Sequence, residues 1–272
     1  MNRGLHYGDG LFETMRAYRG DVFRLDRHVE RLLSGLVVLR ISFRSDAAEI
    51  KALIDQLLLE NGLHNAIIKI IVFRQGPPVP RPEPDMPASI IISAQPFNDP
   101  QAGGRQNGLS GCIVAGRRNS HSELSKLKSL NYLENTLARM EAHARGCDEA
   151  IFLNTEGMVA ETTISNLFIV QGRKIMTPPV AAGILPGITR AAVLSLCSQQ
   201  GYDVREILFT SEDLFKAEEV FMTNSVREIM PLVKVDGRAV GDGKPGAVTR
   251  RVLQLYGSMV ADELEGGGSF ED

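Results

Sequence analysis

A short polar segment that contains proline and glycine separates two long stretches, each of which mixes strand and helix patterns. Residues 98–108 hold Asp99-Pro100 and Gly103-Gly104 among polar residues, a composition typical of an exposed connection between domains. A length of 272 residues suits two domains, because single cores stop growing at roughly 250–300 residues. We therefore predict a first domain at residues 1–97, a linker at 98–108 and a second domain at 109–272.

Both stretches alternate strand-type and helix-type periodicity, which predicts an α+β fold. For the first stretch we predict a hairpin over residues 11–23, helices over 25–39 and 46–61, and two well-buried strands over 66–73 and 88–94. For the second stretch we predict strands at 109–115, 149–153, 166–170, 174–176, 203–209 and 219–222, a hairpin around 236–237, and helices at 130–145, after Gly187 and at 245–264.

Composition argues against several classes of protein. With 43% hydrophobic and 23% charged residues, the chain has the proportions of a globular protein and not of a disordered one. The net charge is −3 and the 30 basic residues are spread along the chain, so we expect no nucleic-acid partner. Three cysteines without a C-x-x-C pair suggest neither a disulfide framework nor a metal cluster, so we expect no metal.

The sequence also suggests where the protein acts. No apolar run approaches the ~18 residues of a membrane span, and Met1-Asn2-Arg3-Gly4 opens without the apolar region of a signal peptide. We therefore expect a cytoplasmic protein that does not associate with membranes.

A phosphate site is suggested by the segment Gly183-Ile184-Leu185-Pro186-Gly187-Ile188-Thr189-Arg190, which precedes an apolar helical stretch. Backbone N–H groups near Ile188 and Thr189 would lie at the positive end of a helix dipole. An ordinary turn before a capped helix has the same sequence pattern, so a phosphate site requires further phosphate-binding residues elsewhere in the chain. Thr223-Asn224-Ser225, directly after a predicted strand, and the guanidinium of Arg31 are candidates, although for each taken alone a simple turn or a surface arginine is the commoner explanation.

Two further residue types suggest covalent chemistry. Lys126 and Lys128 lie in a polar loop before the helix predicted at 130, and a Schiff-base lysine would occupy such a border position. Glu161 lies among small and apolar residues near a predicted strand. Solvated side chains are the alternative explanation for all three.

Six segments, in order and at similar spacing, resemble the fold-type-IV pyridoxal-phosphate enzymes, the class-IV aminotransferase family. This family includes branched-chain aminotransferases, D-amino-acid aminotransferases and aminodeoxychorismate lyases, and the resemblance extends from about Arg3 to about Leu253. The segments are Leu5-His6-Tyr7-Gly8-Asp9-Gly10-Leu11-Phe12-Glu13-Thr14, residues 28–32, Lys128-Ser129-Leu130-Asn131-Tyr132-Leu133-Glu134-Asn135, and residues 161–166, 183–190 and 222–231.

The resemblance implies a role for each matching residue. Lys128 would form the internal aldimine with pyridoxal 5'-phosphate, which leaves Lys126 a bystander, and Glu161 would pair with the pyridine nitrogen. The cofactor phosphate would be held by Arg31, Ile188, Thr189 and Thr223. Tyr132 resembles, across a one-residue gap, the tyrosine directed at the phenolic oxygen of the cofactor.

The chemistry of these residue types agrees with such roles. A carboxylate against the ring nitrogen keeps that nitrogen protonated, so the ring can accept electrons from the substrate. A lysine amine beside the α-carbon can move a proton as a general base and then as a general acid. The resemblance also implies a smaller N-terminal α/β domain, a larger C-terminal mixed-sheet domain, and a homodimer with each active site between the two domains.

The substrate is not identified by the sequence. Residues 74–81 follow no subfamily closely, and Arg74 and Arg81 are both candidate partners for a substrate carboxylate. Phe12, Asn224 and Ser225 complete the candidate substrate-binding set.

Three functions are compatible with these residues. We expect an amino-acid transaminase that transfers an amino group to a 2-oxo acid. The alternative is 4-amino-4-deoxychorismate lyase, which the stretch Met222-Thr223-Asn224-Ser225 favours. A non-catalytic cofactor-binding protein would not need both Lys128 and Glu161.

Overall fold

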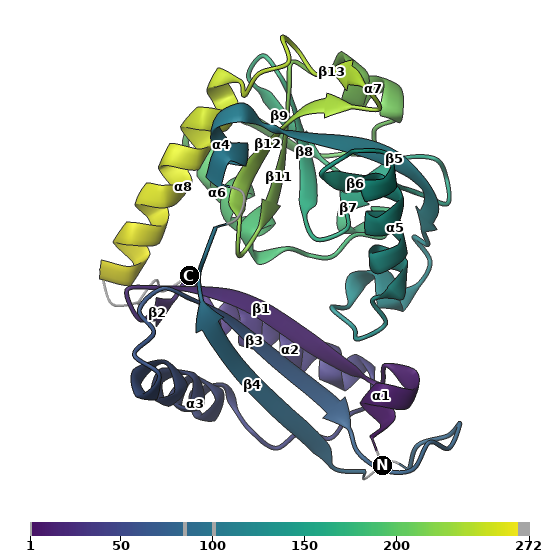
Figure 1. The fold of residues 1–272 in the computed structure, drawn as a ribbon, viewed down its shortest axis with the longest axis vertical. Helices are drawn as coiled ribbons and strands as arrows, with labels where there is room; N and C mark the ends of the chain where they lie inside the picture. The colour runs from purple at the N-terminus through teal and green to yellow at the C-terminus, as the bar shows by residue number, and fades with distance from the viewer. Residues whose placement is uncertain (1, 84–85, 100–101, 266–272) are drawn as a thin grey trace. The chain divides into compact units, whose positions relative to one another are not determined.

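The computed structural model describes residues 2–83, 86–99 and 102–265, which form two compact units (Figure 1). The described part of the first unit comprises residues up to 98 together with 127–132, and the second comprises 99–126 and 133–265. Lys128 therefore belongs to the first unit, although the sequence predicted a second domain that is continuous from residue 109.

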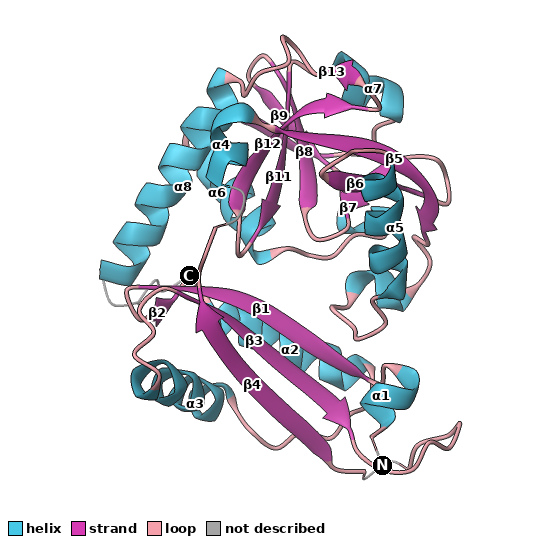
Figure 2. Ribbon diagram, in the orientation of Figure 1, coloured by secondary structure: helices cyan, strands magenta, loops and turns pink. Residues whose placement is uncertain are grey.

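The first unit is built on an antiparallel sheet with the strand order β2-β1-β3-β4 (Figures 1 and 2). Two helices, α2 and α3, pack against one face of this sheet, and their apolar residues share one core with those of the strands. The elements of this unit are α1 (Arg3–Tyr7), β1 (Gly10–Tyr18), β2 (Asp21–Val22), α2 (Leu25–Val38), α3 (Ala47–Glu60), β3 (Ala66–Arg74) and β4 (Ala88–Pro96). The predicted hairpin and both predicted helices are confirmed, and α1 was not predicted.

The local causes of the two confirmed helices are visible in the structure. On α2, Leu25, Val29, Leu32 and Leu36 are buried at the spacing of one helix face. The side chain of Asp46 accepts a hydrogen bond from Glu49 N at 2.9 Å, which caps the start of α3.

The prediction that residues 88–94 form a well-buried strand is wrong. β4 pairs only with β3 among the described strands and is the edge of its sheet, and Ile91 on its open face is 49% exposed. A continuous apolar run is typical of a strand covered on both faces, but β4 packs its apolar residues Ala88, Ile90, Ile92 and Ala94 against the core from one face.

The second unit is built on a mixed sheet. Its strand order is β10-β9-β8-β11-β12-β5-β6-β7, with β13 on β12, and the pairing of β7 with β8 closes six of these strands into a ring. β5 runs parallel to both β12 and β6, and β9 runs parallel to β10. The strands are β5 (Leu109–Arg118), β6 (Glu149–Asn154), β7 (Val159–Thr162), β8 (Asn166–Gln171), β9 (Lys174–Thr177), β10 (Asp203–Glu206), β11 (Glu219–Asn224), β12 (Glu228–Val235) and β13 (Arg238–Ala239). The helices are α4 (Ala102–Asn107), α5 (Leu133–Ala144), α6 (Ile188–Gln199), α7 (Ser211–Lys216) and α8 (Ala247–Glu265).

The predicted linker over 98–108 is partly helical, because it contains α4, in which Gly103, Gln106 and Asn107 are exposed. Arg105 of this helix forms ion pairs with Asp99 at 3.2 Å and with Glu228 at 3.3 Å. A Cβ at Gly104 would lie 2.8 Å from the side chain of Leu109. The glycine therefore permits close packing at this point.

Several other boundaries differ from the prediction: α5 begins at Leu133 and not at 130, β10 ends at Glu206 and not at 209, and β5 and β11 extend to Arg118 and Asn224. The elements β7 and α7 were not predicted. In the described residues, no helix has both the length and the apolar content needed to cross a membrane.

Candidate active site

Lys128 is held against strand β1 by backbone hydrogen bonds on both sides of it. Phe12 N donates to Lys128 O at 2.8 Å, and Leu130 N donates to Gly10 O at 3.0 Å. Asn131 adds a side-chain bond from its Nδ2 to Gly8 O at 3.1 Å. The segment 127–132 is therefore fixed to the first sheet, which explains why the helix predicted at 130 starts three residues later.

The amine of Lys128 lies over an aromatic ring. Its Nζ is 4.8 Å from the ring centroid of Phe12, and the Nζ of Lys69 is 5.0 Å from the same centroid. Tyr132 packs edge-on against Phe12, with the ring centroids 5.4 Å apart. Lys126 differs, because its Nζ pairs with Glu123 at 3.3 Å in the second unit.

Arg31 is part of a buried network with Glu13 and His28. Arg31 donates from Nε and Nη2 to the two oxygens of Glu13, both at 2.7 Å, and His28 Nδ1 lies 2.8 Å from Glu13 Oε2. Glu13 and His28 are each 1% exposed. This bidentate contact fixes the plane of the Arg31 guanidinium.

Burial alone would raise the pKa of Glu13, but the charge of Arg31 and the hydrogen bonds from His28 and Arg31 outweigh it and lower the pKa to about 2. Burial lowers the pKa of His28 despite its hydrogen bond to Glu13. The histidine is therefore neutral at neutral pH and donates its Nδ1–H to the carboxylate.

The substrate candidates of the first unit have different surroundings. The guanidinium of Arg74 is buried and donates to Asp9 Oδ2 at 3.1 Å, Arg40 O at 2.9 Å and Leu39 O at 2.7 Å. Each of its three nitrogens therefore has an internal acceptor, and Arg74 stays a substrate candidate by prediction only. Arg81 is exposed.

In the second unit, Glu161, Asn166 and Thr223 form a row across three adjacent strands. Glu161 of β7 is paired in register with Asn166 of β8, which is paired in register with Thr223 of β11. Directly paired residues point to the same face of a sheet. With strands ~4.8 Å apart, the backbone positions at the two ends of this row are roughly 10 Å apart.

Glu161 is fixed by three neighbours. Its Oε2 accepts hydrogen bonds from Leu185 N at 3.0 Å and Asn166 Nδ2 at 3.4 Å, and its Oε1 lies 3.3 Å from Arg118 Nε. The side chain is nearly buried, with 9% exposed. A carboxylate placed in this way can hold a proton on a basic ring nitrogen.

The start of α6 has the properties of an anion site. Gly187 precedes the helix without a side-chain cap, and the first turn contains no acidic residue. Ala191 N donates to Gly187 O as the helix begins, so the N–H groups before Ala191 are those that a helix leaves for a ligand. Thr189 is buried in this turn.

Gly187 is required at this point by a close approach. A Cβ there would lie 2.0 Å from Asn166 Oδ1. The same asparagine donates to Leu185 O at 2.9 Å. The helix start and the row of Glu161, Asn166 and Thr223 are therefore packed against each other.

Thr223 and Asn224 lie within β11, whereas the sequence predicted a strand that ends at residue 222. β11 is antiparallel to both β8 and β12. The Thr223 hydroxyl is buried and has no hydrogen-bond partner in the described structure. Asn224 makes a turn, since its Oδ1 accepts from Val226 N and Arg227 N and its Nδ2 donates to Ser165 Oγ. Asn224 and Ser225 remain substrate candidates by prediction only.

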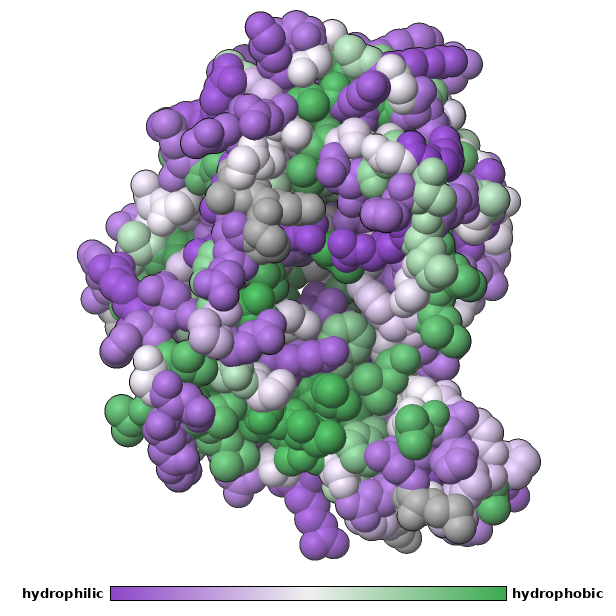
Figure 3. All heavy atoms as spheres, in the orientation of Figure 1, coloured by the Kyte–Doolittle hydropathy of each residue, from purple (hydrophilic) through white to green (hydrophobic). Residues whose placement is uncertain are grey.

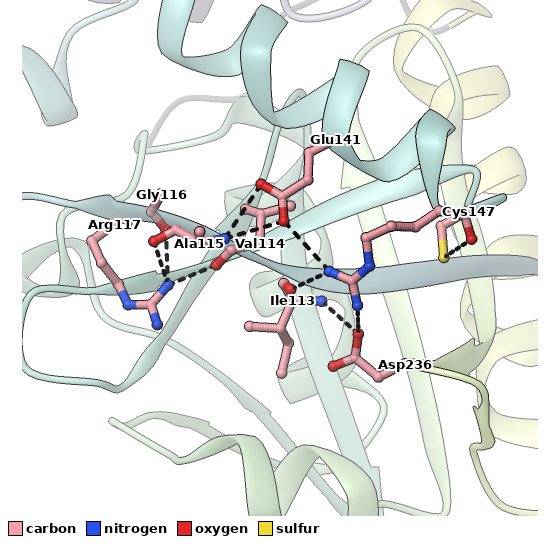
Figure 4. Close-up of polar contacts among 9 residues, drawn as sticks. Ile113, Val114, Ala115, Gly116, Arg117, Glu141, Cys147 and Asp236 are labelled. Atoms are coloured by element: carbon pink, nitrogen blue, oxygen red, sulfur yellow. Dashed lines mark hydrogen bonds and ion pairs between the residues drawn. The ribbon is translucent and has the colours of Figure 1, made fainter.

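Another polar cluster belongs to the scaffold. Arg145, after the end of α5, donates to Asp236 Oδ1 at 2.6 Å and to Ile113 O at 2.8 Å (Figure 4). These bonds tie α5 to β5 and to the turn between β12 and β13. The nearby Cys112 is buried and free, and burial together with the proximity of Cys147 raises its pKa to about 12.

The donor set of the second unit fits pyridoxal 5'-phosphate. It offers a carboxylate for a ring nitrogen and, two strands away, a hydroxyl without a described partner beside a helix start suited to phosphate. The first unit offers a fixed lysine and a fixed arginine. No feature of these two sets requires a metal ion.

Sequence reasoning missed three residues of these sets: Glu13, Asn166 and Arg118. A signal for Glu13 existed, because it shares the buried face of β1 with Leu11, Met15 and Ala17, where a carboxylate must be paired. Asn166 and Arg118 gave no such signal, since their roles depend on pairings between distant strands.

Comparison with known proteins identifies the class of protein. The family model for amino-transferase class IV matches residues 10–235. The branched-chain-amino-acid aminotransferase of Salmonella typhimurium is 32% identical over 274 residues, covering 97% of this chain and 88% of its own. The D-alanine aminotransferase of Bacillus licheniformis is 32% identical over 263 residues, covering 96% and 91%. A branched-chain amino acid aminotransferase from T.th., solved with pyridoxamine 5'-phosphate, superposes with a TM-score of 0.92 at 31% identity, covering 97% and 90%.

The chain therefore belongs to the class IV aminotransferase family and has its two-domain α+β fold. It is a pyridoxal 5'-phosphate-dependent transaminase, which moves an amino group between an amino acid and a 2-oxo acid. The predicted family, fold class, activity and cofactor are confirmed.

Proposed function

We propose that Lys128 carries the cofactor in this transaminase and that Glu161 contacts its ring nitrogen. Ile188, Thr189, Thr223 and Arg31 would hold its phosphate. The observation that carries this proposal is the row of Glu161, Asn166 and Thr223, which presents an acid and an unpartnered hydroxyl on one sheet face beside the start of α6.

Each residue then has a defined task. Bound pyridoxal phosphate supplies an electron sink for the bonds that change at the α-carbon. The Lys128 amine moves the α-proton as a base and then as an acid, and Glu161 keeps a proton at the ring nitrogen. Tyr132, edge-on to Phe12 beside Lys128, would face the phenolic oxygen.

We propose further that one substrate is an amino acid with an apolar side chain. The ring of Phe12 lies beneath the Lys128 amine. Phe12 is in register with Ile71 of β3, and Ile71 is in register with Ile91 of β4. These residues point away from the core shared with α2 and α3, and apolar side chains gather on this part of the molecule in Figure 3. The names of the branched-chain and D-alanine relatives also refer to apolar amino acids.

A panel of amino donors tests this substrate proposal. We expect kcat/KM for L-leucine, L-valine or D-alanine to exceed that for L-aspartate at least about tenfold, because a buried carboxylate without a partner costs several kcal/mol. A preference for L-aspartate would contradict the proposal. Release of pyruvate from aminodeoxychorismate without an acceptor, with no response to amino acids, would instead indicate the lyase.

We also propose a homodimer located in the cytoplasm. The support for the dimer is an apolar stripe on α5, where Leu133, Leu137 and Met140 are 77%, 65% and 63% exposed at i, i+4 and i+7 spacing. The cytoplasmic location rests on the sequence alone.

A further inference from the structure

Arg118 lies behind the carboxylate that is proposed to face the ring nitrogen. It is the last residue of β5, in register with Asn154 of β6. Its Nε lies 3.3 Å from Glu161 Oε1, and both side chains are 9% exposed. The two residues therefore form an ion pair in a largely water-free environment.

The guanidinium of Arg118 cannot easily leave this position. Its Nη1 donates to Glu134 Oε2 at 2.7 Å and to Asn135 Oδ1 at 3.3 Å. Its central carbon lies 4.1 Å from the ring centroid of Phe152. A charge fixed by three neighbours acts on Glu161 without any need for rearrangement during the reaction.

The two oxygens of Glu161 have different partners. Oε2 accepts the hydrogen bonds of Leu185 and Asn166, whereas Oε1 faces Arg118. Burial disfavours a charged carboxylate, and an adjacent positive charge restores its anionic form. With a cofactor bound, a proton shared between Glu161 and the ring nitrogen would be held on the nitrogen, because Arg118 stabilises the carboxylate anion.

We propose that Arg118 is a positioning residue for transamination, which acts through Glu161 by keeping its carboxylate ionised and oriented, so that the cofactor ring nitrogen retains its proton. This inference rests on the proposed role of Glu161.

A double-mutant cycle on the holoenzyme tests the proposal. The variants are Arg118→Gln, Glu161→Gln and the double variant, and the readouts are kcat, KM, the dissociation constant of pyridoxal phosphate and the pH titration of the visible absorption band. We expect Glu161→Gln to lower kcat on the order of 10²-fold. Arg118→Gln should lower kcat about tenfold, with KM changed less than about threefold, and should shift the midpoint of the absorption titration.

The decisive comparison is the effect of Arg118→Gln when Glu161 is already replaced. If Arg118 acts through Glu161, the second change should lower kcat less than about twofold and leave the titration midpoint where Glu161→Gln puts it. The same factor in both backgrounds would overturn the proposal. A Glu161→Gln enzyme with wild-type kcat would instead overturn the proposed role of Glu161 itself.

Two further variants separate charge from folding. Arg117 is exposed and its Nη1 binds the carbonyls of Val114, Ala115 and Gly116 (Figure 4), so Arg117→Gln should match the wild type. Arg118→Lys retains the charge and should recover most of the kcat lost in Arg118→Gln. Equal loss in the lysine and glutamine variants would contradict a role for charge. If Arg118→Gln does not fold, Arg118→Lys takes its place in the cycle. A smaller loss of kcat is then expected, and its effect is again compared in the presence and absence of Glu161.

Discussion

At the scale of single residues, two of the charged side chains proposed to contact the cofactor are held by a partner of opposite charge. Arg31 is paired with Glu13 in the first unit, and Glu161 is paired with Arg118 in the second. An unpaired buried charge costs several kcal/mol, so the partner is needed before any ligand arrives. The pairs also fix the direction in which each functional group points.

The Glu13 pair makes a testable prediction about stability and pH. The pKa of Glu13 falls from an ordinary 4.5 to about 2 in the folded protein. The unfolded chain therefore binds more protons than the folded one between these values, and the carboxylate stabilises the fold fully above pH 4.5 and loses this effect as pH falls toward 2. We expect Glu13→Gln to lower the free energy of unfolding by about 3 kcal/mol at pH 7 and by less at about pH 3, measured by urea denaturation.

The matched control for Glu13 is Glu30 on the same helix as Arg31. Glu30 pairs with Arg27 at 3.3 Å, but their side chains are 65% and 61% exposed. Glu30→Gln should change stability by less than about 1 kcal/mol at either pH. An equal loss in both variants, or a Glu13 effect independent of pH, would show that the buried pair does not have the assigned role.

The residues of the site could be predicted from the sequence only where they lie in a segment that resembles the family. The resemblance supplied Lys128, Glu161 and Thr189. Arg74 was a candidate from its residue type alone, and its buried contacts with Asp9 and two backbone carbonyls could not be foreseen, because they depend on the return of β3 to the end of α2.

At the scale of elements, the start of α6 depends on a glycine. A Cβ at Gly187 would collide with Asn166, which contacts both Glu161 and Leu185. We expect Gly187→Ala to weaken binding of pyridoxal phosphate by about tenfold or more, since the phosphate contacts and the ring-nitrogen contact would shift together. Fluorescence titration of the apoprotein measures this.

Gly257 offers the control, because it lies in helix α8, is exposed, and no described atom lies within 4 Å of an added Cβ. Gly257→Ala should leave cofactor binding unchanged and raise the free energy of unfolding by about 0.5–1 kcal/mol. Unaltered cofactor affinity in a folded Gly187→Ala protein would be evidence against the phosphate site at α6.

Elements with strong local signals were predicted well, and those set by distant pairing were not. The first hairpin, α2 and α3 follow from turn residues, apolar spacing and the cap at Asp46. The start of α5 could not be predicted, because residues 128–130 are drawn into pairing with β1. The position of β4 at the edge of its sheet could not be predicted, because its apolar run is equally typical of a central strand.

At the scale of the whole molecule, each unit has a core of its own, which explains how two sets of functional residues can be rigid independently. The proposed assembly adds a prediction at this scale. Replacing Leu137 and Met140 by glutamate should convert a dimer to a monomer, because two charges would enter an apolar interface.

Size-exclusion chromatography with light scattering measures this change of mass. Leu59→Glu on α3 is the control, because Leu59 is 82% exposed outside the α5 stripe, and it should leave the mass unchanged. A double variant that retains the mass of two chains would place the interface elsewhere.

The central claim is that transamination in this chain runs through Lys128, and covalent labelling tests it most directly. Borohydride reduction of the holoenzyme fixes the cofactor to the lysine that carries it, and peptide mapping then identifies that lysine. We predict the label on Lys128, no label and no visible absorption band in Lys128→Ala, and normal labelling in Lys126→Ala. A label on any other lysine of the wild-type enzyme would contradict the account.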